Sequence, residues 1–284
     1  MSGYWAGIIA ILCFNIVVAY SVFLPAASGQ LNLGAAGFVA IGAYTSGYGS
    51  TDMGLPMWLA IMFGAAVTGL VAFLISFPIL RTRGVYMVLA TFAFAEVVQG
   101  IYINLEIFGA AAGYPVAAFA DLDVIVPLTI GVVVFVFFLM TTRLGLTMRA
   151  VHDDEPVASL FGVNTRLTQI AAFTLGGVVA GIGGAIWAHN FNYVEIQNFN
   201  ILLSIFVLLY VLIGGTQTAF GPLVGAVFFT LIPEALRVSE EWRFVFFGIL
   251  IILMMVVRPE GLVTRTMVDR VKGVFFRRRS PVEG

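Results

Sequence analysis

The chain has 284 residues, of which 61% are hydrophobic and 10% are charged, and its mean hydropathy is +1.04. Soluble domains are about half apolar and about a quarter charged, so this composition excludes a water-soluble globular protein. The net charge of -1 hides an uneven distribution, because Lys272, Arg277, Arg278 and Arg279 gather near the C-terminus. The net charge therefore says nothing about nucleic acid, and we expect no nucleic-acid partner for this membrane chain.

Apolar segments recur along almost the whole chain. A helix needs about 20 apolar residues to cross about 30 Å of hydrocarbon. The segments that we expect in the membrane are Trp5–Leu24, Gly34–Tyr48, Met57–Phe77, Val85–Ile103, Val124–Met140, Leu167–Ala188, Phe199–Ile213, Pro222–Ile232 and Phe244–Val257. The first has no basic region before it, so we interpret it as a retained span. It also holds the only cysteine, Cys13, which excludes an internal disulfide or thiolate metal site.

Two glycine-rich breaks that carry amide side chains separate neighbouring apolar segments. They are Ser28–Gly34 and Ile213–Pro222. The segment after the second break would rise only about 17 Å as a helix, so it cannot span unless it begins part-way through the bilayer. The sequence therefore predicts an all-α, polytopic membrane helix bundle with two interrupted or re-entrant helices.

Unwound backbone at membrane depth is tolerated where protein buries it or where it lines a wet cavity. Glu96 joins the breaks as a candidate, because an ionisable group well inside Val85–Ile103 is costly unless it faces protein, water or a partner. The alternative is structural: glycines let helices pack closely, and polar side chains hydrogen-bond across an interface. The residues that we expect along a translocation path are Gln30, Asn32, Gly34, Glu96, Gly214, Gly215, Thr216, Gln217 and Thr218.

Basic residues gather in three stretches, which the positive-inside rule places in the cytoplasm. The loops 106–123 and 189–198 have no lysine or arginine, so we expect them outside, together with the N-terminus. Polar residues of the second loop, such as His189 and Asn192, either meet a binding protein or are simply solvated. Arg237 and Arg243 near the expected outer loop 233–241 disagree with the pattern. The three stretches are Arg81 and Arg83; Arg143, Arg149 and Arg166; and Arg258, Arg265, Arg270 and the tail.

The longest polar stretch, residues 141–166, contains the signals of a short helix. Asp154 or Glu155 can cap its start, Pro156 suits its first turn and Gly162 can end it. Acidic residues at the start also face the positive end of the helix dipole. A short capped helix between spans offers a partner a rigid surface. The alternative is an ordered loop whose charges are only solvated.

This stretch resembles the ATPase-contacting cytoplasmic loop of the branched-chain amino acid ABC transporter permeases. The loop residues that match are Gly145, Arg149, Ala150, Asp154, Glu155, Ala158 and Gly162. The other matches, in the same order along the chain, are Gly29-Gln30 with Leu33-Gly34 and Gly42-Ala43-Tyr44; Arg83–Tyr86 with Thr91–Glu96; Gly214-Gly215 with Gly221-Pro222 and Gly225-Ala226; and Arg258–Leu262. Asn32 and Pro156 depart from the family's pattern. The common order over nearly the whole chain carries the resemblance.

The resemblance implies a transmembrane permease subunit of an ATP-binding-cassette importer for branched-chain amino acids or related small polar solutes, in a bacterial inner membrane. Residues 1–265 would form the permease domain and 266–284 a basic cytoplasmic tail. The implied partners are a second, homologous permease subunit, two cytoplasmic ATPases, an extracytoplasmic solute-binding protein and membrane lipid. The coupling loop to the ATPase would comprise Arg149, Ala150, Asp153, Asp154, Glu155, Ala158 and Gly162.

ATP and Mg are expected on the partner subunits, because the chain has no Gly-x-x-x-x-Gly-Lys-Ser/Thr phosphate loop. An ion-coupled secondary transporter or channel is the alternative function, since broken helices suit it equally well. An intramembrane enzyme fits poorly, because His152 and His189 are expected on opposite sides of the membrane and no catalytic constellation is visible. We therefore expect no catalytic residues, no metal site and no cofactor in this chain.

Overall fold

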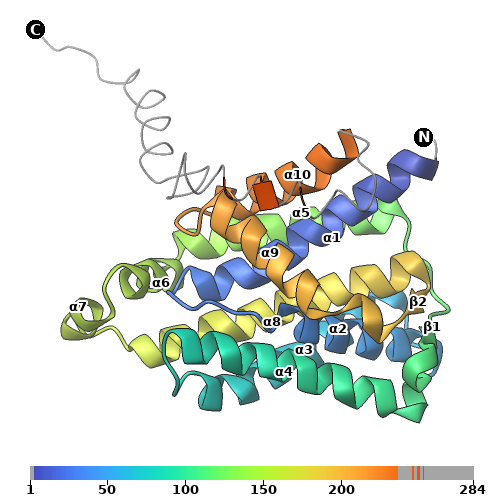
Figure 1. Cartoon of the computed structure of the whole chain (residues 1–284), viewed down its shortest axis with the longest axis horizontal. Helices are drawn as coiled ribbons and strands as arrows, with labels where there is room; N and C mark the ends of the chain where they lie inside the picture. Colours follow the sequence, from blue (N-terminus) through green and yellow to red (C-terminus); the bar gives the residue numbers. More distant parts are fainter. Residues whose placement is uncertain (1–2, 236–244, 246–247, 250–251, 253–284) are drawn as a thin grey trace, which may run out of the picture.

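The computed structural model describes residues 3–235, 245, 248–249 and 252. Within this part, the chain forms an all-α bundle with one short β ladder, which confirms the predicted fold class (Figure 1). The helices are α1 Gly3–Ala26, α2 Ala35–Thr51, α3 Met57–Ile79, α4 Val85–Asn104, α5 Leu122–Thr141, α6 Arg143–Asp153, α7 Glu155–Leu160, α8 Thr165–Phe191, α9 Ile201–Gly214 and α10 Phe220–Ala235. The 3-10 turns η1 Glu106–Phe108, η2 Ala110–Ala112 and η3 Ile196–Asn198 and the strands β1 Tyr114–Pro115 and β2 Tyr193–Val194 lie in the loops.

Each membrane segment expected between Trp5 and Ile232 corresponds to one of these helices. The expected segment Phe244–Val257 lies almost wholly outside the described residues, as does the tail 266–284. In the described part of the chain, six helical segments are long and apolar enough to cross a membrane, namely Gly3–Ala26, Met57–Ile79, Val85–Asn104, Leu122–Thr141, Thr165–Phe191 and Ile196–Gly214. The helix α2 and the apolar part of α10 are shorter than these.

Helix α8 forms the centre of the bundle and packs against α1, α2 and α3 (Figure 1). Small residues make this packing close. A Cβ atom at Gly42 would lie 2.4 Å from the Cα of Gly181, and one at Gly184 would lie 2.1 Å from the carbonyl oxygen of Val39. Hydrocarbon provides no hydrophobic force between helices, so backbone-to-backbone van der Waals contact of this kind is what holds membrane helices together. The centre is therefore a rigid frame for the segments around it.

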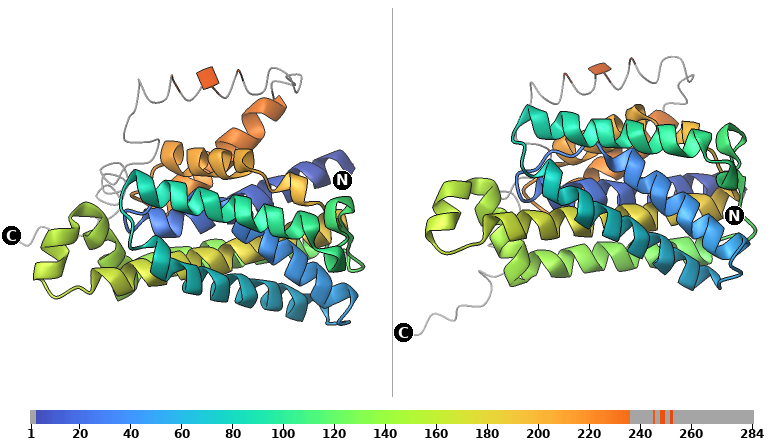
Figure 2. Two further views of the ribbon diagram at one scale, coloured as in Figure 1. Left: turned by 60° about the horizontal axis from the view of Figure 1, so that its bottom comes forward. Right: turned by 90° about the horizontal axis from the view of Figure 1, so that it is seen from below.

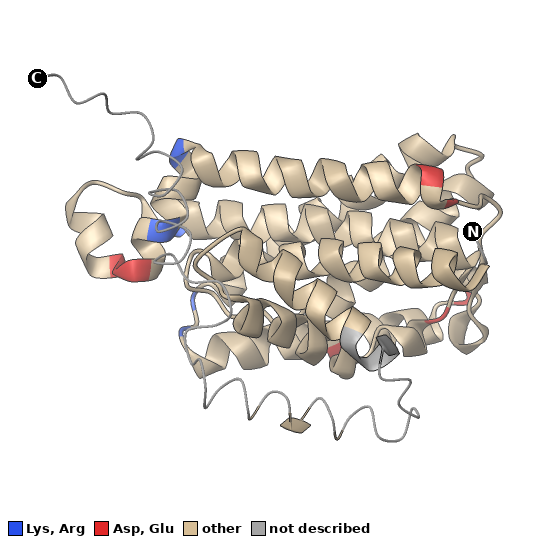
Figure 3. Cartoon of the chain, turned by 90° about the horizontal axis from the view of Figure 1, so that it is seen from above, with Lys and Arg blue, Asp and Glu red and all other residues tan. Residues whose placement is uncertain are grey.

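Charged side chains distinguish the two ends of the bundle. Among the described residues, the arginines gather at the end that carries α6 and α7, while the N-terminus lies at the other end (Figure 3). Both views in Figure 2 show α6 and α7 projecting beyond the long helices. This grouping agrees with the first two basic stretches of the sequence, so α6 and α7 are at the end that the positive-inside rule assigns to the cytoplasm.

At the opposite end, the two loops without lysine or arginine meet through β1 and β2, which pair antiparallel. The hydroxyl of Tyr114 donates to the Asp52 carboxylate. Burial, and then this carboxylate, raise the pKa of Tyr114. These contacts tie the end of α2 to the loop before α5.

The expectation that His189 belongs to a polar outer loop was wrong, because this side chain is fully buried in the last turns of α8. Its Nδ1 lies 3.0 Å from the Ala118 carbonyl oxygen and its Nε2 lies 2.9 Å from the Ser46 hydroxyl. A carbonyl oxygen only accepts, so Nδ1 donates to Ala118, and Nε2 shares a hydrogen bond with the Ser46 hydroxyl. His189 is therefore a structural residue that fastens the outer loop to α2 and α8.

Candidate functional site

The helix α7 has the predicted caps. The Asp154 carboxylate accepts a hydrogen bond from the Val157 backbone N–H at 3.0 Å, and Pro156 lies in the first turn. Gly162 follows the helix with a φ of +80°, a conformation that favours glycine. The predicted start, first turn and end are thus confirmed, with Asp154 as the capping residue of the helix Glu155–Leu160.

The helix α6, which was not predicted from the sequence, connects α7 to the bundle. Its Met148 and Val151 are buried, and the Arg149 guanidinium donates to the Met140 carbonyl oxygen at 3.0 Å. His152 Nδ1 donates to the carbonyl oxygen of Ala26 at 3.0 Å. The helix is therefore fixed to the ends of α5 and α1. The buried positions Gly145, Met148 and Val151 are three residues apart, and this spacing was the available signal for the helix.

The structure brings the predicted coupling residues together on α6, α7 and the turn that follows. Ala158 is buried, so it packs the helix and does not offer a surface to a partner. Asp153, Asp154 and Gly162 are exposed. Glu155 makes an ion pair with Arg83 at 3.7 Å, which links α7 to the loop between α3 and α4. The Arg83 side chain is mostly exposed, so this pair contributes little to stability.

The most exposed large apolar residues of this unit were not among the predicted ones. Leu160 is 85% and Phe161 84% exposed, and the neighbouring Val157 is also exposed. Exposed apolar side chains that gather in one place are typical of a surface that contacts a protein or a membrane. The signal in the sequence was an apolar pair directly before Gly162 in an otherwise polar stretch.

The first break is firmly held by hydrogen bonds from its backbone. The Asn32 side-chain oxygen accepts from the Gly34 N–H at 2.7 Å, and the Leu33 N–H donates to the Thr91 hydroxyl at 3.0 Å. The Ala36 N–H donates to the Ser204 hydroxyl at 2.9 Å. These bonds connect the break and the start of α2 to α4 and α9. The contacts of Asn32 and Gly34 therefore support the structural interpretation, in which these residues hold the break in place.

Gln30, in the same break, differs from Asn32. Its side chain is 2% exposed, yet neither its amide nitrogen nor its amide oxygen has a hydrogen-bond partner among the described residues. A buried polar group without a partner costs about 1 to 3 kcal/mol. An unpaired buried group in an otherwise well-bonded break requires an explanation, which a bound ligand or an ordered water would supply.

The second break lies within the depth of the bundle. The Tyr20 hydroxyl donates to the Ala219 carbonyl oxygen at 2.9 Å, and Tyr20 is six residues, or about 9 Å, from the end of α1. Further along, Asn15 Nδ2 donates to the Thr230 hydroxyl at 2.9 Å. The helix α10 therefore runs back along α1 from an internal starting point, as its short length required.

Two glycines of the second break pack the hairpin between α9 and α10. A Cβ atom at Gly214 would lie 2.0 Å from the Gly221 carbonyl oxygen, and Gly215 has a φ of +112°. These values support the structural interpretation for both residues. Thr218 is buried, while Thr216 and Gln217 are partly exposed. Their contact with a solute stays a prediction.

Glu96 lies on an outward face of α4 and is exposed in this single chain. On the same helix, Leu89, Val97 and Ile101 are exposed too, and a Cβ atom at Gly100 would meet nothing within 4 Å. A carboxyl at mid-helix is costly in lipid, so this face needs water or another protein surface. The first break thus contacts α4, the second contacts α1, and Glu96 faces outward from this chain.

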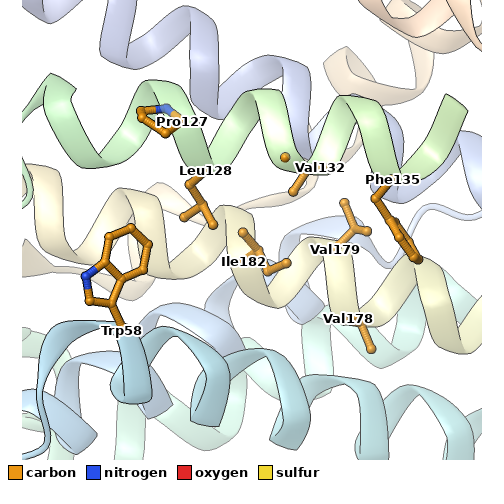
Figure 4. Close-up of a pocket in the computed structure, with 9 residues that line it drawn as sticks. Trp58, Pro127, Leu128, Val132, Phe135, Val178, Val179 and Ile182 are labelled. Atoms are coloured by element: carbon orange, nitrogen blue, oxygen red, sulfur yellow. The ribbon is translucent and has the colours of Figure 1, made fainter. Parts of the chain in front are cut away.

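An apolar groove of about 450 Å³ lies between α3 and α5 over α8 (Figure 4). Trp58 of α3 is at one end and Phe135 of α5 at the other, with Val178 and Ile182 of α8 between them. Binding of a polar solute requires placed polar groups, which this lining lacks. The groove suits a lipid acyl chain. Within the described residues, no group of three or more His, Cys, Asp or Glu side chains is placed to hold a metal ion.

Long apolar helices, close glycine packing and a helix pair that projects from one end define a multi-pass α-helical membrane protein. Residues 4–255 match the family described as branched-chain amino acid transport system / permease component, and the chain belongs to this family. It is a multi-pass protein of the inner membrane, in a family of transport permeases.

Curated relatives agree with this family. The high-affinity branched-chain amino acid transport system permease protein LivM of Escherichia coli K12 is 28% identical over 275 residues, which cover 84% of this chain and 65% of that protein. The nucleoside ABC transporter permease protein NupC of Lactococcus lactis is 28% identical over 187 residues, 56% of this chain and 59% of the relative. The chain thus spans less than two thirds of the length of these relatives. No solved structure matches it.

Proposed function

We propose that this chain is a transmembrane permease subunit of an ATP-binding-cassette importer for branched-chain amino acids or related small polar solutes, with ATP hydrolysed by partner subunits. The observation that supports this most is the unit of α6 and α7, which is capped, fixed to the bundle and apolar at its tip. The names of the relatives supply the solute class, since one carries branched-chain amino acids and another nucleosides.

The proposed partners follow from the surfaces that this chain leaves open. The outward face of α4 with Glu96 suits a second, homologous permease subunit, because contact with protein or a wet path between the subunits removes the cost of a carboxyl in lipid. The tip of α7 suits one of two cytoplasmic ATPases, which would hold ATP and Mg. The opposite end, where β1 and β2 join the loops, would meet an extracytoplasmic binding protein.

Movement of the ATPases would reach the membrane through α6. ATP binding closes the two ATPases, and α7 moves with them as a rigid body. The bond from His152 to Ala26 carries this motion to the end of α1, directly before the first break, and the bond from Arg149 to Met140 carries it to α5. The region around Gln30 thereby changes its access from one side of the membrane to the other.

Uptake by the complex in proteoliposomes distinguishes this function from an ion-coupled transporter or channel. We expect uptake of a branched-chain amino acid to require ATP with the ATPases and to continue when ionophores remove all ion gradients. The amino acid is added together with the solute-binding protein of the importer. Uptake that follows an imposed ion gradient without ATP would contradict the proposal and favour the secondary transporter.

The two amides of the first break should respond differently to mutation. Gln30→Leu removes a buried amide without a partner, so we expect the thermal stability of the complex to stay the same or rise while uptake falls about tenfold. Asn32→Ala is the matched control, because it removes the bond to the Gly34 N–H and should lower stability by about 1 to 2 kcal/mol. Normal uptake by Gln30→Leu would exclude Gln30 from the path.

A further inference from the structure

A polar cavity of about 440 Å³ lies at the arginine-bearing end, beneath the proposed coupling helix. Its walls come from the first break, the loop between α3 and α4, Glu155 of α7 and the first residues of α8. These four segments are far apart in the sequence. Neither contact with an ATPase nor passage of a solute explains why they enclose one polar space.

The charges around this cavity favour an anion. Arg81, Arg83 and Arg166 line it, against the single carboxylate of Glu155, so three positive charges and one negative charge leave a surplus of two. Arg83 is engaged by Glu155 at 3.7 Å. Arginine presents a planar set of donors that fits carboxylate and phosphate oxygens, and it does so better than lysine.

Two helices also begin at this cavity. Gly84, which lines it, precedes the 20-residue α4 and has no side chain to cap it, so the capping residue bonds the Met87 N–H through its carbonyl oxygen at 3.2 Å but provides no acceptor for the N–H groups of Val85 and Tyr86. Thr165 and Arg166, which also line it, are the first residues of the 27-residue α8. The N-terminus of a helix carries a partial positive charge and unbonded N–H groups, both of which attract oxyanions.

The unpartnered amide of Gln30 lines the same cavity and points independently to a ligand. Its nitrogen is buried and has two N–H donors to offer. An oxyanion in the cavity would accept one of these hydrogen bonds and would remove part of the cost of burying the amide. Neither the arginines nor the helix ends alone would explain this buried donor.

We propose that this cavity binds an oxyanion, a carboxylate or a phosphate, through Arg81, Arg166, the start of α4 and the Gln30 amide. Such an anion competes with Glu155 for Arg83, so its presence loosens the ion pair that links the α3–α4 loop to α7. This second step rests on the proposed coupling role of α7, whereas the binding step does not. The oxyanion is either a soluble molecule at the cytoplasmic face, including the carboxylate of a transported amino acid, or the headgroup of an anionic lipid.

Thermal unfolding of the purified importer in nanodiscs of neutral phosphatidylcholine tests the binding step. Inorganic phosphate is titrated against chloride at equal ionic strength, with the ATPase sites filled by MgADP. We expect a saturable rise in Tm with phosphate. In Arg81→Gln/Arg166→Gln the apparent affinity should fall at least about tenfold, because charge-assisted hydrogen bonds are lost. Arg143→Gln is the matched control, since Arg143 is an exposed arginine at the same end that does not line the cavity.

Nanodiscs that contain phosphatidylglycerol distinguish the two sources. If a lipid headgroup occupies the cavity, the rise in Tm with phosphate is absent in nanodiscs that contain phosphatidylglycerol and present in nanodiscs of neutral lipid. If the ligand is soluble, the rise in Tm is the same in both kinds of nanodisc. Either result supports the site. An equal phosphate response in the double variant and wild type, or no response in either, would overturn it. Loss of ATPase co-purification in the double variant without any phosphate effect would also overturn it, by assigning the arginines to subunit docking.

Discussion

Replacing Leu160 and Phe161 together with serine is expected to reduce ATP-driven uptake by about a hundredfold while the permease remains folded in the membrane. Both side chains are more than four-fifths exposed, so folding gains little from them. At an interface the same side chains would be apolar contacts, and burial by a partner would contribute about 1.5 kcal/mol for each, or about 3 kcal/mol for the two. Each 1.4 kcal/mol or so corresponds to a tenfold change in affinity.

The measurements are solute uptake, stimulation of ATP hydrolysis by solute, and co-purification of the ATPases with the permease. All three should fall in the double variant. Ser159→Ala is the matched control, because Ser159 is an exposed neighbour whose hydroxyl donates only to the Pro156 carbonyl oxygen of its own helix, at 2.6 Å. Unchanged uptake and ATPase co-purification in the double variant would show that α7 does not contact the ATPases.

The membrane helices were predictable from the sequence because hydrocarbon imposes a length and a composition on every span. The cap of α7 was predictable because Asp154, Pro156 and Gly162 act through bonds to their own neighbours in the chain. The helix α6 is a different case. Its position depends on the ends of α1 and α5, which the Thr141–Thr165 stretch itself does not reveal.

The candidate site was predictable in composition but not in role. Gln30 and Asn32 are two amides in one glycine-rich break, yet one is unpartnered and the other bonds the Gly34 N–H. The break is further fixed by Thr91, which is 58 residues away from Leu33 and cannot be identified as its partner from local pattern. Gly214 was expected on the path, but its close approach to Gly221 is a packing contact that only the folded hairpin shows. The role of Glu96 depends on a surface outside this chain.

Close packing between α2 and α8 should make Gly184 a position that tolerates no larger side chain. A Cβ atom there would lie 2.1 Å from the Val39 carbonyl oxygen and 2.5 Å from the Ala43 nitrogen. Both are backbone atoms, so no side-chain rotation relieves the overlap, and the two helices would have to separate. Overpacking of a tight core costs about 1 to 3 kcal/mol and more where backbone must move. We therefore expect Gly184→Val to remove the permease from the membrane fraction.

The amount of permease in the membrane, measured by immunoblot, and the Tm of the purified complex test this prediction. Gly184→Ala should have a smaller effect in the same direction, because it adds one carbon where valine adds three. Gly131→Ala is the control on α5: a Cβ atom there meets nothing within 4 Å, and alanine favours a helix over glycine by about 1 kcal/mol. Its abundance should equal that of the wild type. A normal amount of Gly184→Val in the membrane would mean that α2 and α8 do not touch backbone to backbone. The bundle would then lack the rigid centre that supports both breaks.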